Sequence, residues 1–196
     1  MPVLVNPYLS FGGGAGPVDL TEQWGEVARQ ETISAGKLTI SGLDLSGIQV
    51  CRVLINGVTV TTDNTQIFLR LHIGGSEVSA SAYRYSTRRL TTSVDDIISS
   101  GSGIDVTEIP LSSSASSRGV GNASTEGFGA DLVLFGVSGS LYKRGSLHTW
   151  YTKPDGVVMS HYAGTLQLAD TGAVTGLTVY GDSDLTGGSV VVLGVE

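Results

Sequence analysis

The chain has 196 residues and a formal net charge of −7, with an isoelectric point near 4.8. This length suits one domain with its own core, and the acidity argues against nucleic-acid binding, which normally requires a basic surface. Only 15% of the residues are charged, whereas 40% are hydrophobic and 28 are glycine. A disordered chain has fewer apolar residues, so this composition indicates short strands joined by many turns.

Two further features limit the class of protein. No apolar run approaches the ~18 residues needed to cross a membrane, and residues 1–7 lack the basic start and apolar stretch of a signal peptide. We therefore predict a soluble product without membrane insertion. The single cysteine, Cys51, excludes an internal disulfide and lies within an apolar run, so we expect its thiol to be buried.

Residues 1–20 differ from the rest of the chain. They contain three of the five prolines and a glycine-rich stretch at 12–16, a combination of extended and flexible backbone. The segment is nevertheless rich in apolar side chains: Val3, Leu4, Val5, Tyr8, Leu9 and Phe11. We predict an extended N-terminal arm that packs on a neighbouring subunit, with a poorly ordered tag as the alternative. The domain is then residues 21–196.

Strand patterns recur after the arm. In Ile48–Val60 both alternating sets are apolar, which is typical of a strand covered on both faces. Asn56-Gly57 within it is also a hairpin signal, but a turn there would leave 58–62 without a role, so one strand is predicted. The strands predicted in this half are Trp24–Ile33, Lys37–Ser41, Ile48–Val60, Gln66–Ile73 and Glu77–Tyr85.

Residues 86–128 are rich in Ser, Thr and Gly and are predicted to be irregular, with one short helix at Ser93–Ser99 that Ser93 could cap. Long irregular segments tend to carry function or subunit contacts. Strands are then predicted at Ala130–Val137, Ser140–Arg144, Leu147–Tyr151, Val157–Tyr162, Gly176–Tyr180 and Ser189–Val195. About ten short strands with glycine-rich turns predict an all-β fold, an antiparallel, jelly-roll-like β-sandwich.

Metal and catalytic motifs are sparse. The three histidines, His72, His148 and His161, lack the spacing of a zinc site and are predicted to lie at the surface or in an interface. Asp182 and Asp184 share a loop and could bind calcium, but Asp and Gly also dominate ordinary hairpins, and the hairpin is favoured. We expect no cofactor, no metal and no enzymatic activity.

Two groups of residues are candidates for contacts. Arg84, Arg88 and Arg89 form the one local basic and aromatic cluster, which would grip a neighbouring subunit or bind a carboxylate or anionic sugar. Aromatic faces can also stack on sugars. The candidates of that kind are Trp150, Tyr151 and Tyr162.

The order of segments resembles a β-sandwich module of tailed-bacteriophage virion proteins. An Ile-Ser-Gly-Leu-Asp-Leu-Ser-Gly segment at 40–47 leads into an Arg-bearing apolar strand at 50–55, a Thr-Asp-Asn turn at 62–64 and a further strand at 66–71. Ile48 and Leu193 stand where the module often has Tyr. The other matching features are Trp24, Tyr83-Arg84-Tyr85, the loop at 119–123, the apolar strand at 132–135 and the C-terminal Gly-Gly-Ser-Val-Val-Val-Leu-Gly.

The resemblance implies a virion surface component without catalytic residues, commonly homotrimeric. Such a protein would be a capsid decoration or head-fibre protein, or a tail-fibre or tail-tip component. It would be made in the host cytoplasm and located in the virion, with copies of itself and other virion proteins as partners. The alternative is a glycan-binding receptor-recognition module of a phage fibre, whose partners are host surface glycans.

Overall fold

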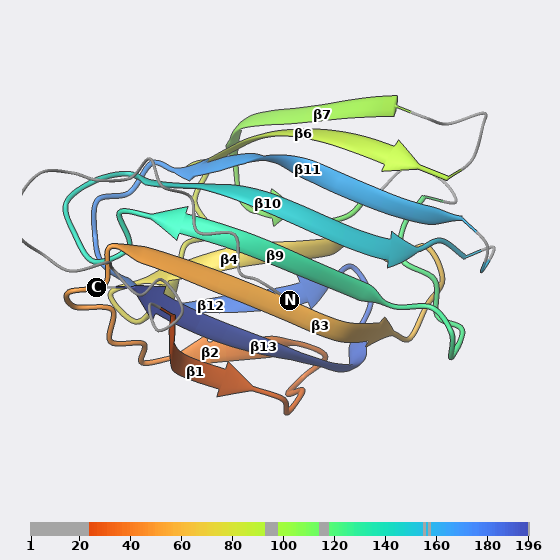
Figure 1. Cartoon of the computed structure of the whole chain (residues 1–196), viewed down its shortest axis with the longest axis horizontal. Helices are drawn as coiled ribbons and strands as arrows, with labels where there is room; N and C mark the ends of the chain where they lie inside the picture. The colour runs from red at the N-terminus through yellow and green to blue at the C-terminus, as the bar shows by residue number, and fades with distance from the viewer. Residues whose placement is uncertain (1–23, 93–97, 114–117, 155, 157, 196) are drawn as a thin grey trace, which may run out of the picture.

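A computed structural model describes residues 24–92, 98–113, 118–154, 156 and 158–195 (Figure 1). Within these ranges the chain forms thirteen β-strands and no helix, so no membrane-spanning helix occurs there. Two antiparallel sheets pack face to face. The predicted all-β, antiparallel sandwich is therefore confirmed. The predicted arm, with its six apolar residues, lies outside the described residues.

The two sheets differ in size. The larger contains, in spatial order, β1 (Gly25–Gln30), β13 (Leu185–Val195), β3 (Val50–Val60), β9 (Phe128–Phe135), β10 (Lys143–Thr152), β11 (Met159–Leu168), β6 (Tyr83–Thr91) and β7 (Ile98–Val106). The smaller contains β2 (Leu38–Ser41), β12 (Val174–Gly181), β4 (Ile67–Ile73) and β5 (Ser76–Glu77), and β8 (Ile109–Pro110) also pairs with β4. Strand pairing places β1 and β7 at the two edges of the larger sheet.

The core lies between the sheets and follows from the alternation of each strand. Leu69 and Leu71 of β4 face Val53, Ile55 and Leu132 from the larger sheet, and all five are fully buried. Burying a side chain of this kind stabilises the fold by roughly 1.5–3 kcal/mol. The alternate residues of each strand point outward, so the sandwich has two outer faces on which a site could be built.

The Asn56-Gly57 pair makes a β-bulge instead of a hairpin. Strand β3 continues through it to Val60, as predicted, but its pairing register with β9 shifts between Ile55 and Val58. Gly57 has a φ of 61°, a conformation that glycine adopts without strain. The extra residue lets Val58 and Val60 point into the core although their parity differs from that of Ile55. The prediction of strand coverage on both faces holds only in part, since Leu54 is half-buried.

The strand predicted at Glu77–Tyr85 is wrong. Glu77 ends the short strand β5 of the smaller sheet, whereas Tyr85 belongs to β6 of the larger sheet. The chain therefore crosses from one sheet to the other at 78–82. Polar and apolar residues alternate from Glu77 to Ala82, and the alternation breaks at Ala82-Tyr83, where β6 begins. This break is a local sign of the crossing.

The prediction that 86–128 is irregular is also wrong over much of its length. Strand β6 runs on to Thr91, and β7, β8 and the start of β9 follow. Of the predicted helix at 93–99, residues 93–97 lie outside the described residues, while Ile98 and Ser99 belong to strand β7. Glycine has a packing role here, because a Cβ on Gly103 would lie 2.4 Å from the ring of Tyr85.

The strands predicted at Ser140–Arg144 and Leu147–Tyr151 are one strand, β10, which begins at Lys143. Gly145 does not break it, because a Cβ there would lie 2.2 Å from the carbonyl oxygen of Val133 on β9, so only glycine allows this close approach. The other predicted strands exist with shifted ends. They correspond to β1, β2, β4, β9, β11, β12 and β13.

Candidate functional site

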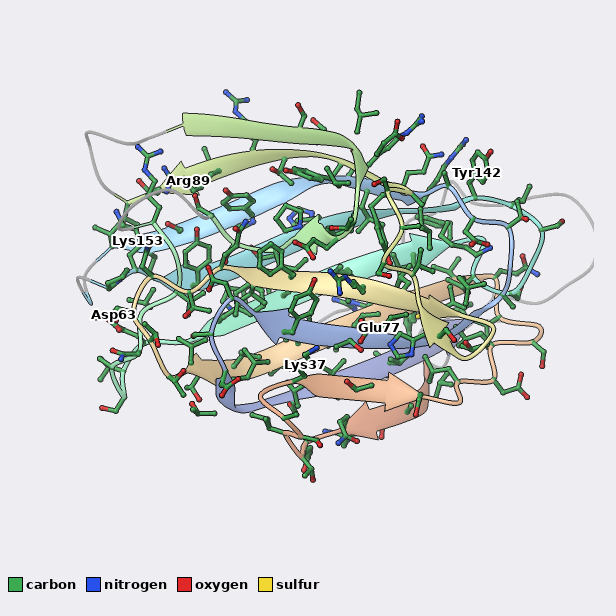
Figure 2. The ribbon with its side chains drawn as sticks, turned by 180° about the vertical axis from the view of Figure 1, so that it is seen from behind. Lys37, Asp63, Glu77, Arg89, Tyr142 and Lys153 are labelled. Carbon is green, nitrogen blue, oxygen red and sulfur yellow. The ribbon has the colours of Figure 1, made fainter. Side chains whose placement is uncertain are left out.

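Strand parity divides the six predicted contact residues into two groups. Arg84, Arg88 and Trp150 point outward from the larger sheet, where each is exposed. Their neighbours Arg89 and Tyr151, together with Tyr162, point inward and are buried (Figure 2 labels Arg89). The structure therefore does not bring the six together on one surface.

The inward group belongs to the core. Tyr151 is 1% exposed, and its ring centroid lies 6.4 Å from those of both Phe128 and Tyr162. Its hydroxyl donates to the carbonyl of Arg118 at 2.9 Å and accepts from the amide of Ser113 at 3.2 Å. Burial raises the pKa of Tyr151 to about 12. This tyrosine is held by the fold and does not present its ring to a ligand on the described surface.

Of the three aromatic candidates, Trp150 is the one that lies open on the outer face. It pairs with Gly129 on β9 and with His161 on β11, and His161 pairs with Leu90 on β6. A Cβ on Gly129 would lie 2.4 Å from the indole Nε1, so the ring packs directly over the glycine backbone. The residue is still 42% exposed. Glycine on one strand thus allows tryptophan on the next to lie against the sheet and offer its ring to solvent.

Titratable groups surround this tryptophan. The imidazole rings of His148 and His161 stack with their centroids 5.6 Å apart, and burial, followed by the proximity of His148, lowers the pKa of His161. Asp131 on β9 pairs with His148 on β10. Its carboxylate accepts a hydrogen bond from the guanidinium of Arg52 at 2.9 Å. This hydrogen bond holds the pKa of Asp131 below its ordinary value. The surface therefore combines an aromatic plane with polar donors and acceptors.

A second open feature lies at one end of the same sheet. A depression of about 520 Å³ is lined by Phe135, the loop residues Leu141 and Tyr142, Arg144 and Thr171. Phe135, Leu141 and Tyr142 are 49%, 70% and 47% exposed. Large apolar side chains gathered in this way on a soluble domain mark interaction surfaces. Figure 2 shows Tyr142 and Asp63 at opposite ends of the sandwich.

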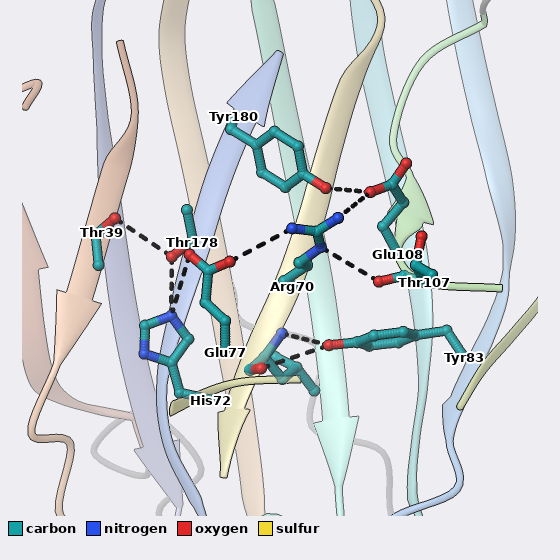
Figure 3. A network of polar contacts seen from close by, with 10 residues as sticks. Thr39, Arg70, His72, Glu77, Tyr83, Thr107, Glu108, Thr178 and Tyr180 are labelled. Carbon is teal, nitrogen blue, oxygen red and sulfur yellow. Dashed lines mark hydrogen bonds and ion pairs between the residues drawn. The ribbon is translucent and has the colours of Figure 1, made fainter. Parts of the chain in front are cut away.

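The outer face of the smaller sheet carries a polar network instead (Figure 3). The guanidinium of Arg70 contacts Glu108 at 2.7 Å and Glu77 at 3.5 Å, and lies 4.9 Å from the centroid of Tyr180. The Tyr180 hydroxyl donates to Glu108, and burial raises the pKa of Tyr180. The charged groups of this face pair with one another, so they are already engaged within the chain.

His72 belongs to this network, and its position differs from the prediction that it lies at the surface or in an interface. It is buried rather than at the surface, and its Nε2 lies 2.8 Å from Thr178 Oγ1 and 4.0 Å from Glu77 Oε1. Burial lowers the pKa of His72, partly offset by Glu77. Sequence pattern placed His72 on the non-core side of its strand, but could not show that side chains from β5 and β12 cover it.

The carboxylates considered for calcium are used within the fold. Asp182 Oδ1 accepts from the amide of Gln66 at 2.9 Å, and the Asp184 side chain packs against Gly36. Among the residues that the structure describes, no group of three or more His, Cys, Asp or Glu side chains is placed to hold a metal ion.

Sequence reasoning missed the end depression. The sequence pattern predicts a strand over Leu141 and Tyr142, but both lie in the loop before β10 and are exposed.

Comparisons with protein-family models, with curated proteins and with solved structures found no match.

Proposed function

We propose that this protein is a structural subunit of a tailed-bacteriophage virion that assembles with copies of itself. One observation carries the proposal: the larger sheet and its end loop expose large apolar side chains that assembly would cover. These residues are Leu90, Ile104, Phe135, Leu141, Tyr142, Trp150 and Met159.

Two further features support this proposal. The edge strands β1 and β7 of the larger sheet each have one neighbour in the described chain, and open edges are normally covered or paired. The resemblance of segments 40–71 and of the C-terminal strand to a phage virion module supplies the biological setting. We accordingly propose a homotrimer that has a structural rather than a catalytic role. It would be either a capsid decoration or head-fibre protein, or a tail-fibre or tail-tip component.

Sedimentation velocity over a range of concentrations tests the assembly. We expect an oligomer for the wild type and a shift toward monomer for Leu90→Asp, which places a charge within the apolar face. Thr62→Asp, in an exposed loop outside this face, is the matched control and should leave the oligomer intact. Immunolabelling of particles purified from the lysed host tests the location. A persistent monomer that is absent from particles would contradict the proposal.

A second candidate function is recognition of host surface glycans, and the Trp150 surface favours it. Apolar C–H groups of a sugar ring can pack on an exposed indole, and Asp131, His148 and Arg88 provide polar groups on the same outer face. This role is compatible with a fibre or tail-tip position in the particle.

A glycan array tests this second function. We expect binding by the wild type and its loss in Trp150→Ala, with binding retained in Trp24→Ala, the matched control at the other tryptophan. If the wild type binds no glycan at high protein concentration, or if binding survives Trp150→Ala, this surface is not a glycan site.

A further inference from the structure

We propose that the depression lined by Phe135, Leu141 and Tyr142 receives residues 3–11 of a second copy of this chain. The proposal rests on the proposed function, in that it names the contact through which copies assemble.

The loop that forms one wall of the depression is held in place. Val137 is fully buried, and its carbonyl accepts from the amide of Val174 at 2.8 Å. The buried ammonium of Lys143 donates to the carbonyls of Gly139 and Leu141, both at 2.7 Å. Burying a lysine is costly unless its donors are satisfied, and here those donors fix the segment that carries Leu141 and Tyr142. The fold therefore holds Leu141 and Tyr142 in their exposed positions.

The chemistry of residues 3–11 complements this wall. The segment carries six apolar side chains, and the chain has no charged side chain before Asp19. Pro2 and Pro7 favour an extended backbone, and extended proline-containing segments dock in grooves lined by aromatic residues. Backbone carbonyls of such a segment lack partners within it, and Arg144 and the Tyr142 hydroxyl can donate to them.

The chain between the arm and β1 is long enough to reach the depression. Gly25 pairs with Gly194, Gly194 with Cys51, and Cys51 with Leu134, the neighbour of Phe135. The start of β1 thus lies three strand spacings from the depression, roughly 15 Å. Phe11 precedes Trp24 by 13 residues, which can span about 43 Å when extended. The connection is more than twice as long as docking within one copy needs, so its length also allows the arm to reach a second copy, and the choice of a second copy rests on the proposed assembly.

A contact between the arm of one copy and the depression of the next is heterologous. Such contacts close into rings when the rotation between copies allows it, so the proposed homotrimer is a natural product of this geometry. Docking of the arm in its own copy would cover the depression without joining any copies.

Cysteine crosslinking between two separately made variants tests the proposal. Leu9→Cys protein is mixed with Leu141→Cys protein and oxidised, and we expect a disulfide-linked heterodimer. Native Cys51 does not interfere, because it is buried and burial raises its pKa to about 12. The matched control pairs Leu9→Cys with Thr62→Cys, at the opposite end of the sandwich, and should give at least about fivefold less product. In parallel, Leu141→Ser/Tyr142→Ser should weaken self-association by about tenfold or more.

The outcomes distinguish the arm contact from the proposed function. A heterodimer yield no higher than the control, or crosslinking only within one chain when both cysteines are in one molecule, overturns the arm contact. If the wild type still sediments as an oligomer in that case, the proposed function stands without this contact. A monomeric wild type would instead remove the proposed function itself.

Discussion

The hydroxyl of Tyr83 accepts a hydrogen bond from the backbone amide of Leu71 at 2.9 Å and thereby links the two sheets. Tyr83 lies on β6 of the larger sheet, and Leu71 lies on β4 of the smaller one. Along the edge of β4, β5 pairs with residues 72–73 and β8 pairs with residues 68–69. Tyr83 therefore satisfies a buried amide in the gap between two short edge strands.

We predict that Tyr83→Phe lowers the free energy of unfolding by about 1–3 kcal/mol, because it leaves a buried amide without its partner. Urea unfolding followed by circular dichroism measures the change. Tyr142→Phe is the matched control, since Tyr142 is about half exposed, and should change the free energy by less than about 0.5 kcal/mol. Equal effects of the two substitutions would contradict the role given to the inter-sheet bond.

Gly129→Ala is predicted to displace the indole of Trp150, because the added Cβ would lie 2.4 Å from Nε1. In a Trp24→Phe background Trp150 is the only tryptophan, so its fluorescence reports on this position alone. We expect a red shift in emission and a loss of stability of about 1–3 kcal/mol. Gly139→Ala, where a Cβ meets nothing within 4 Å, should leave the emission unchanged. An unshifted spectrum for Gly129→Ala would show that the indole does not depend on this glycine.

Much of the fold could be predicted because its strands are amphipathic. Alternation of Ile67, Leu69 and Leu71 correctly identified a core face, and the run through Val53 and Ile55 correctly identified a central strand. The crossing between sheets at 78–82 is hard to predict, because the alternation of polar and apolar residues continues to Ala82 and breaks only at Ala82-Tyr83, a break that a bulge within one strand would also produce. Strand β7 escaped prediction because serine and glycine have weak strand preference, and its pairing with β6 outweighs that preference.

The candidate surface was less predictable than the fold. Trp150 and Tyr151 are adjacent and chemically similar, but neighbours in a strand point to opposite faces, so Trp150 is exposed and Tyr151 lies in the core. The network around Arg70 joins residues 77, 108 and 180, which only the three-dimensional pairing of strands brings together. Lys143, the residue that holds the end loop, has no local signal that distinguishes it from a surface lysine.

Cys51 is predicted to be unreactive in the folded protein. Its side chain is buried and its thiol pKa is raised to about 12 by burial, so the nucleophilic thiolate is scarce at neutral pH. A thiol reagent such as Ellman's reagent should label less than about a tenth of the protein natively and one thiol per chain in denaturant. Rapid native labelling would contradict the buried position of this residue.

Stability is predicted to fall as the pH drops below about 6.5, in part because of His72. Burial lowers the folded-state pKa of His72 below its ordinary value of 6.5, so the unfolded chain binds the proton first. The stability that it contributes is fully present above pH 6.5 and is lost as the pH falls toward the folded-state pKa. Unfolding free energies at about pH 7.5 and 5.5 should therefore differ less in His72→Gln than in the wild type. An identical pH dependence in both proteins would refute this assignment.

Lys143→Met is predicted to loosen the end loop more than it destabilises the fold. Methionine retains an apolar stem but removes the two hydrogen bonds to the carbonyls of Gly139 and Leu141. Burial lowers the pKa of Lys143 in the folded protein, which reflects the cost of desolvating its ammonium. Methionine removes this cost, so the free energy of unfolding should change by less than about 2 kcal/mol. Amide hydrogen exchange should accelerate about tenfold at residues 137–142 and remain unchanged in the core strand β3. Lys37→Met, whose ammonium lies over the ring of Tyr180 on the smaller sheet, is the matched control and should leave exchange in the loop unchanged. If the loop keeps its protection in Lys143→Met, the exposed Leu141 and Tyr142 are held by the strands alone.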